Sequence, residues 1–244
     1  MFNILEHPPQ IEHNTRKDQM IEYSTEMGVT LINHMGNDRT VAEAARVSTL
    51  GLDNDRQKYV GLVRALIRDK HWSPFMHPTM TIAFDVPLFV RSQLVTHYSL
   101  ARSEFSMRYS KAKPKFWIPA HDRPLVQVGK ALDYRREAGT KQQSSQASIG
   151  IHQVAVKSWE SYCELVNSGI TPEVARAVLP QSTYTTLWLT GNLRSWLAFL
   201  DNRMDKHAQH ETQEVGVKVA EIFAQHYPIT YEAWSENNAR TTQK

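Results

Sequence analysis

Apolar and polar side chains alternate from Met80 to Val86, and this stretch constrains the fold of the 244-residue chain more than any other. The apolar set is Met80, Ile82, Phe84 and Val86, and the set between them is Thr81, Ala83 and Asp85. A period of two predicts a β-strand with one buried face. Pro87 lacks a backbone N–H, so we expect it to close the strand and to begin a helix. The chain should therefore mix strands with helices.

Helical patterns lie on both sides of the predicted strand. We expect Thr40 to cap a short helix over Val41 to Val47. Asp53 to Asp55 should begin a second helix. Its apolar face would comprise Tyr59, Val60, Val63, Leu66 and Ile67.

The single cysteine, Cys163, excludes an intrachain disulfide and a cysteine-clustered metal site. It recurs at helical spacing with Ile151, Val154, Ala155, Trp159, Tyr162 and Val166. This spacing predicts a packing role in a helix that ends near Gly169. The surrounding sequence supplies no setting that would stabilise a thiolate, so we do not expect a cysteine nucleophile.

Two segments lie on either side of the helix that contains Cys163. The polar segment from Asp122 to Gln146 should run over the surface, as a lid or a subunit contact. Thr171 and Pro172 favour a helix start, with Arg176 one turn inside and Pro180 at the end.

The last predicted helix runs from about Asn192 to Arg203. At 3.6 residues per turn, Asn192, Phe199 and Arg203 share one face. That face could line a cleft, or it could be a core face that ends in an arginine reaching for solvent.

Other classes of protein receive little support. No run of about eighteen apolar residues exists, and the first ten residues do not resemble a leader, so we expect a cytoplasmic protein without a membrane partner. His207, His210 and Glu211 lie close together, but their spacing is not the His-Glu-x-x-His pattern of zinc hydrolases. We therefore expect no metal.

The stretch from Gln93 to Tyr109 carries the clearest chemical signal. Ser106 and Arg108 offer a hydroxyl, successive backbone N–H groups and a guanidinium, which suit phosphate oxygens. Residues 91–115 contain one acid, Glu104, and six cations: Arg91, Arg102, Arg108, Lys111, Lys113 and Lys115. Taken alone, this patch fits a nucleotide site, a solvated stripe or a nucleic-acid footprint.

Four separated segments resemble the flavin-dependent thymidylate synthase family, and they occur in the same order. They are residues 44–48, 71–77 and 93–109, and a C-terminal set of Ala175-Arg176, Leu179-Pro180, residues 190–194 and Arg203. The resemblance implies an α+β fold, with a single domain over residues 1–244 and a β-sheet core flanked by helices. It also implies a homotetramer whose active sites lie between subunits.

The resemblance further implies reductive methylation of dUMP at C5 to give dTMP. FAD would be the cofactor, methylenetetrahydrofolate the carbon donor and NADPH the reductant, with no nucleic acid as partner. Arg203 would bind the uracil edge as the catalytic residue, and the other substrate contacts would be Gln93, Glu104, Ser106, Arg108 and Arg176. The cofactor contacts would be His71, Ser73, Thr96, His97, Tyr98, Glu104, Asn192 and Arg194.

The chain also departs from the family pattern. Thr96-His97-Tyr98 stands where the family usually has Arg-His-Arg, and Met76, Ala101, Ser103 and Ala198 differ as well. A virus-like member, acting in the host cytoplasm, would account for this divergence. Two other hypotheses are an altered product, such as a 5-hydroxymethyl pyrimidine nucleotide, and a nucleotide- or RNA-binding protein without catalysis. Arg91 and Arg102 could compensate for the lost charge.

Overall fold

The computed structural model describes residues 20–50, 59–130 and 133–242. The chain divides into two compact units, which are described separately. Unit 1 contains residues 1–25, 106–125 and 138–183, and unit 2 contains residues 26–105, 126–137 and 184–244. The predicted mixture of strands and helices is confirmed, whereas a single domain over the whole chain stays a prediction. Within the described ranges, no helix is long and apolar enough to cross a membrane.

Unit 2 is built on a four-stranded antiparallel sheet. Its strand order is β2 (Gly28–Met35), β3 (Thr79–Pro87), β8 (Tyr184–Asn192) and β4 (Ala101–Glu104). The predicted strand is β3, and its four apolar residues are buried as expected. Pro87 is both the last residue of β3 and the N-cap residue of α3 (Leu88–Leu94), which confirms the predicted change from strand to helix.

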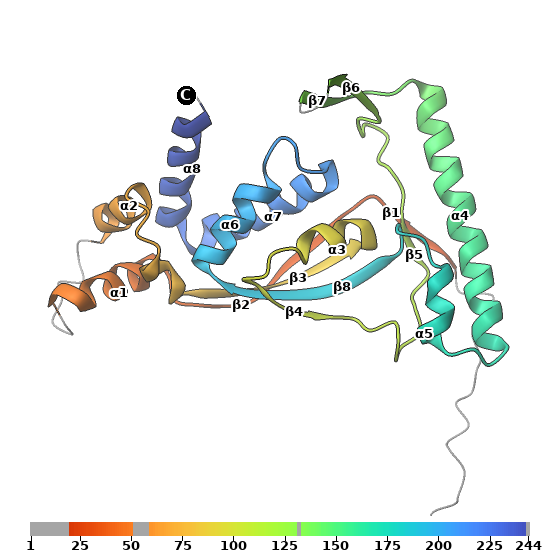
Figure 1. The fold of residues 1–244 in the computed structure, drawn as a ribbon, viewed down its shortest axis with the longest axis horizontal. Coiled ribbons are helices and arrows are strands. Elements are labelled where there is room, and N and C mark those ends of the chain that lie inside the picture. The colour runs from red at the N-terminus through yellow and green to blue at the C-terminus, as the bar shows by residue number, and fades with distance from the viewer. Residues whose placement is uncertain (1–19, 51–58, 131–132, 243–244) are drawn as a thin grey trace, which may run out of the picture. The chain divides into compact units, whose positions relative to one another are not determined.

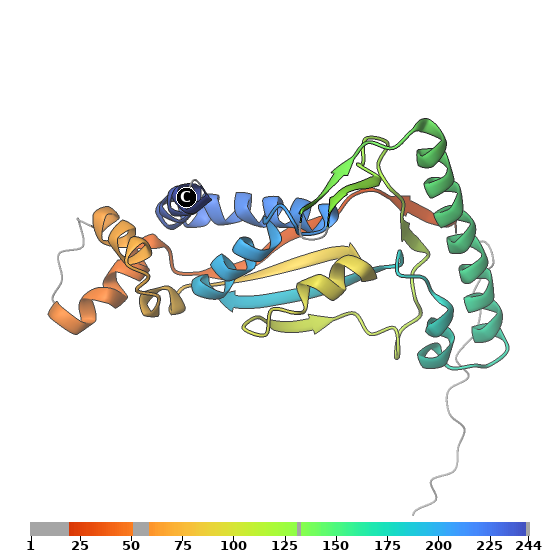
Figure 2. The ribbon, with the colours of Figure 1, turned by 45° about the horizontal axis from the view of Figure 1, so that its top comes forward.

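Three helices of unit 2 cover one face of this sheet. They are α3, α6 (Leu193–Arg203) and α7 (His210–His226) (Figures 1 and 2). Phe84 of the sheet packs against the aromatic rings of Trp196 and Phe199 from α6. The opposite face of the sheet is more open, since Trp188 is 47% exposed. One layer of helices therefore buries one side of the sheet.

At one end of the sheet lie α1 (Asp38–Leu50), α2 (Val60–Arg68), the 3-10 turn η1 (Ser73–Met76) and α8 (Pro228–Thr242) (Figure 1). Asp38 is buried and fastens α1 to α8. Its carboxylate accepts hydrogen bonds from the backbone N–H of Ile229 at 2.9 Å and of Thr230 at 3.0 Å, and also from the Thr230 hydroxyl. Asp38 thus caps the first turn of α8, where the N–H groups have no partner within the helix.

The start of α1 differs from the prediction. Asn37 is the capping residue, because its side-chain oxygen accepts from the backbone N–H of Arg39 and of Thr40. Thr40 instead accepts from the Asn37 N–H at 3.2 Å, as the reciprocal partner inside the helix. In the second predicted helix Val63, Leu66 and Ile67 are buried in α2, whereas Asp53 to Asp55 lie outside the described residues.

Unit 1 contains the long helix α4 (Lys141–Asn167), the short helix α5 (Pro172–Ala175) and the 3-10 turn η2 (Arg176–Val178). It also contains a parallel pair of strands, β1 (Glu22–Ser24) and β5 (Lys115–Trp117). Cys163 is buried in α4, as predicted, and Gly169 follows the helix with a φ of 90°, which favours glycine. Thr171 is the N-cap position of α5, although it makes no side-chain capping bond.

The segment from Asp122 to Gln146 has more regular structure than predicted. It contains an antiparallel hairpin of β6 (Val126–Lys130) and β7 (Asp133–Glu137), which belongs to unit 2. It also contains the start of α4, where Thr140 and Gln143 form a capping box. The Thr-x-x-Gln spacing is a recognised helix-start pattern, but the surrounding residues are so polar that no apolar face marks the helix that follows.

Candidate functional site

Arg203, the predicted catalytic residue, is held by two predicted cofactor contacts. Its Nε donates to Nε2 of His97 at 2.8 Å, and its Nη2 donates to the hydroxyl of Thr96 at 2.9 Å. The His97 ring packs against Phe199, with ring centroids 4.9 Å apart. Arg203 ends α6, and the other two residues follow α3, so neighbouring helices on one face of the sheet build this cluster.

Burial sets the protonation of the Arg203 cluster. Burial lowers the pKa of His97 to about 4, and the positive charge of Arg203 adds to the effect. Burial also lowers the pKa of Arg203 from its ordinary value. At neutral pH His97 is therefore uncharged. Because its Nε2 accepts the hydrogen bond from Arg203, we assign its proton to Nδ1.

Glu104 is the one acid of the basic stretch, and the structure gives it defined partners. One carboxylate oxygen is hydrogen-bonded and ion-paired with Arg91. The other accepts from the Thr185 hydroxyl at 3.3 Å. Arg102 donates to the backbone carbonyl of Val95 at 3.1 Å. Both arginines proposed to compensate for lost charge are thus already engaged by protein groups.

The predicted flavin contacts of the turn and of α6 gather at one end of the sheet. Asn192 pairs with Thr79 at the ends of β8 and β3, and the backbone N–H of Leu193 donates to the Pro78 carbonyl at 3.1 Å. Asn192 also caps α6, since its side-chain oxygen accepts from the Ser195 N–H at 3.0 Å. The structure brings His71 and Ser73 of the η1 region to the same end, where both are exposed.

This end of the sheet offers a donor set that fits an anionic cofactor. Arg194 lies exposed in the first turn of α6, and no described residue forms an ion pair with it. The partial positive charge of a helix N-terminus favours phosphate or other anionic groups. Along the axis of α6, Arg194 and Arg203 are roughly 14 Å apart at 1.5 Å per residue. An extended molecule could therefore contact both ends of the helix.

Unit 1 brings three predicted substrate contacts, Ser106, Arg108 and Arg176, together around an acid. The Arg108 guanidinium donates to the Glu173 carboxylate at 2.5 Å, and Arg176 donates through Nε to the Glu173 carbonyl at 3.3 Å. The Ser106 hydroxyl accepts from the Arg108 N–H at 3.4 Å. Glu173 raises the pKa of Arg108, which lies at the protein surface. No signal in the sequence indicates this role of Glu173, because its carboxylate pairs with Arg108, 65 residues away in the chain.

Two of the predicted ligand contacts, Tyr98 and Gln93, have exposed side chains. Tyr98 is 95% exposed. Gln93 is also exposed, and its backbone carbonyl accepts from the Thr96 hydroxyl at 2.8 Å. Both therefore stay predictions as ligand contacts.

His210, the first residue of α7, has a carboxylate partner. His210 lies 3.3 Å from the Glu214 carboxylate, and Gln209 donates to Glu211 at 2.9 Å. Burial raises the pKa of Glu214. In the described part of the chain, no group of three or more His, Cys, Asp or Glu side chains is arranged to hold a metal ion.

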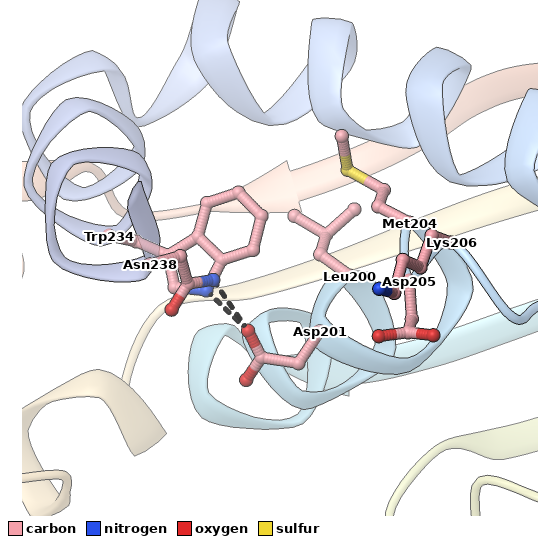
Figure 3. A pocket seen from close by; sticks show the side chains of 7 residues that line it. All are labelled: Leu200, Asp201, Met204, Asp205, Lys206, Trp234 and Asn238. Carbon is pink, nitrogen blue, oxygen red and sulfur yellow. Dashed lines mark hydrogen bonds between the residues drawn. The ribbon is translucent and has the colours of Figure 1, made fainter. Parts of the chain in front are cut away.

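A pocket of about 460 Å³ lies between α6 and α8. Figure 3 shows its lining: Leu200, Asp201, Met204, Asp205, Lys206, Trp234 and Asn238. One oxygen of Asp201 accepts from the Trp234 indole at 2.8 Å and from Asn238 at 2.9 Å. Asp201 and Arg203 are two positions apart and project in nearly opposite directions around α6. The pocket is therefore separate from the Arg203 cluster, and Asp201 serves to join the two helices.

Comparisons with known proteins agree on one family. Residues 30–229 match the family model described as thymidylate synthase complementing protein. The chain is 38% identical over 206 residues to the flavin-dependent thymidylate synthase of Thermotoga neapolitana, which covers 84% of this chain and 89% of the relative. It is 33% identical to that of Streptomyces avermitilis, over 88% of this chain and 93% of the relative.

The fold is similar to that of a solved structure, the UMP/dUMP methylase PolB from Streptomyces cacaoi bound with 5-Br dUMP. The TM-score is 0.83 at 34% identity, and the match covers 88% of this chain and 97% of the other. PolB has also been solved with 5-Br UMP, with a TM-score of 0.82.

Proposed function

The chain belongs to the flavin-dependent thymidylate synthase family, an enzyme family, and from that premise we propose that it converts dUMP to dTMP with FAD as its flavin. Methylenetetrahydrofolate supplies the carbon and NADPH the reducing equivalents in this proposal. The single observation that supports the proposal is the Arg203 cluster. Its guanidinium is held by Thr96 and His97 at the end of α6, the helix whose residues the resemblance assigns to substrate and flavin.

Arg203 provides the electrostatic part of the proposed reaction. Uracil gains negative charge when its ring is activated at C5, and a fixed guanidinium stabilises such charge without having to reorganise. Burial also strengthens this interaction, because the surroundings of Arg203 are less polar than water. A lysine would reproduce the charge but not the planar pair of donors.

The residues at the end of the sheet fit FAD. Arg194 and the Asn192 side chain would hold it at the start of α6, together with Ser73, His71 and His97. When bound, the reduced flavin supplies hydride. The protein groups orient the flavin and balance its charge, so no side chain of the chain needs to become covalently attached to the substrate.

Ser106, Arg108 and Arg176 are proposed to hold the phosphate of dUMP. The Arg108 guanidinium already donates to a carboxylate oxygen of Glu173, and it can donate to a phosphate oxygen instead, because both groups present anionic oxygen acceptors. Gln93 and Glu104 remain proposed substrate contacts, and Glu104 and Tyr98 remain proposed cofactor contacts.

We further propose the homotetramer that the resemblance implies, with active sites completed between subunits. The open face of the unit 2 sheet supports a subunit contact. It carries Trp188, a large apolar side chain that is 47% exposed and that a second subunit would cover.

A second candidate substrate is UMP. It is favoured by the likeness to PolB, whose description names both UMP and dUMP. An altered product also remains a candidate, because Thr96 and Tyr98 replace two arginines of the family pattern.

Two measurements on the purified protein test the proposal. Its absorbance spectrum should show bound flavin, and turnover with dUMP, methylenetetrahydrofolate and NADPH should release dTMP. Parallel assays with UMP give the ratio of the two kcat/KM values. A protein that binds no added FAD, or that turns over neither nucleotide, would contradict the proposal. Arg203→Ala should abolish turnover while leaving the unfolding transition in place.

A further inference from the structure

We propose that Thr96 and His97 are positioning residues, which hold the Nε and Nη2 side of the Arg203 guanidinium so that its Nη1 end is presented to the substrate. This inference rests on the proposed role of Arg203 and deepens it. A guanidinium has two edges that can each form a pair of parallel hydrogen bonds. Here two protein acceptors take one edge, and no described residue is hydrogen-bonded to Nη1.

The Thr96 hydroxyl can act only as an acceptor toward Arg203. The hydroxyl hydrogen is donated to the backbone carbonyl of Gln93, with the oxygens 2.8 Å apart. A hydroxyl has one hydrogen and two lone pairs, so the side turned to Arg203 can only accept. The Nη2–H bond at 2.9 Å is therefore supported by a second bond that orients the acceptor.

His97 is fixed in a comparable way. Its ring packs on Phe199 with centroids 4.9 Å apart, which limits rotation, and its Nε2 lies 2.8 Å from Nε of Arg203. Among the described residues, Arg203 is the charged group that is hydrogen-bonded to this ring. A protonated imidazole could not accept from a guanidinium, so the neutral ring is the form that holds Arg203.

The two acceptors leave a defined surface for the base. The remaining end of Arg203 carries Nη1 and the second hydrogen of Nη2, which point in the same direction in the guanidinium plane. This end matches two adjacent acceptors in one plane, as an ionised uracil ring presents at a carbonyl oxygen and its neighbouring ring nitrogen. Threonine at position 96 therefore helps to hold Arg203, because its hydroxyl is a neutral acceptor. An arginine at this position would instead place a second cation beside Arg203.

The test compares three substitutions at one position in the flavin-loaded enzyme. Thr96→Val keeps the shape but removes the acceptor, and we expect kcat for dUMP to fall about tenfold to a hundredfold, as when a hydrogen bond to a charged group is lost. The KM for dUMP should change by less than about twofold, because the phosphate contacts remain. Thr96→Ser keeps the hydroxyl and should retain most of kcat.

Thr96→Arg restores the family residue and makes the sharpest contrast. It removes the acceptor and places a like charge beside Arg203, so kcat should fall as it does for Thr96→Val. A matched control is Thr183→Val, since Thr183 is buried and its hydroxyl has no hydrogen-bond partner among the described residues. This control should leave kcat and KM unchanged.

The outcomes separate this inference from the proposed function. If wild-type protein forms no methylated nucleotide, the proposed function fails. If wild-type protein is active and Thr96→Val or Thr96→Arg is equally active or faster, only the positioning role is overturned. A fall in kcat for Thr96→Ser equal to that for Thr96→Val would also overturn it. His97→Phe, which keeps the ring packing, should lower kcat even when FAD is added to saturation and the flavin-loaded fraction is measured by absorbance; unchanged kcat per loaded site would remove His97 from the proposal.

Discussion

The same glycine-to-alanine substitution should have opposite effects on stability in two helices. Gly216 lies in α7, and a Cβ built there would meet Met204 Cγ at 2.9 Å and the backbone carbon and oxygen of Arg203 at 3.1 Å. Gly150 lies in α4, and a Cβ there would have no described atom within 4 Å. Alanine is favoured over glycine inside a helix by about 1 kcal/mol, so this gain is common to both positions.

At Gly216 the packing cost should exceed that gain. Overpacking a tight contact costs about 1–3 kcal/mol, and here a backbone has to move rather than the end of a flexible side chain. We therefore expect Gly216→Ala to lower the free energy of unfolding by up to about 2 kcal/mol. Gly150→Ala should raise it by about 0.5–1 kcal/mol.

Urea unfolding of both variants and the wild-type enzyme measures these changes. Because Gly216→Ala also presses on the backbone of Arg203, its kcat should fall, whereas Gly150→Ala should keep the wild-type value. Equal stabilisation by both substitutions would refute the close approach of α7 to the end of α6.

Three further predictions concern other parts of the chain. Asp38→Ala should lower the free energy of unfolding by about 2–4 kcal/mol, measured in urea, because it removes the cap of α8 and leaves three donors unpaired; a loss below about 1 kcal/mol would show that water replaces the carboxylate. Glu173→Gln should lower the KM for dUMP several-fold in steady-state assays, since the phosphate no longer displaces an anion from Arg108, and a raised KM would contradict this. Burial raises the pKa of Tyr227 to about 12, above that of an unfolded tyrosine, so stability should fall as the pH rises from about 10 to about 12. Tyr227→Phe should make that fall less steep in thermal unfolding, and an unchanged slope would exclude the effect.

Periodicity predicted those parts of the fold that depend on burial within one element. The strand containing Phe84, the helix around Cys163 and the helix ending at Arg203 were all read correctly, because alternation and helical spacing report directly on which side chains are buried. Helix starts were less accurate. At α1 the capping residue is Asn37, since two polar residues three apart can each be read as the cap.

Pairings between distant positions could not be predicted from spacing. Arg203 meets His97 across 106 residues, and no period in the sequence links them. The basic stretch showed six cations and one acid, but the pairing of Glu104 with Arg91 depends on how β4 lies beside α3 and β8. The resemblance selected most of the candidate residues, and the structure supplied their protein partners.

The mass of the nucleotide product tests the central claim most directly. Purified protein would be incubated with dUMP, FAD, NADPH and methylenetetrahydrofolate, and the nucleotide would be analysed by mass spectrometry. The proposed function predicts a product in which one methyl group replaces the hydrogen at C5, formed only when both FAD and methylenetetrahydrofolate are present. A hydroxymethylated product, or dUMP recovered unchanged by flavin-loaded protein, would contradict it.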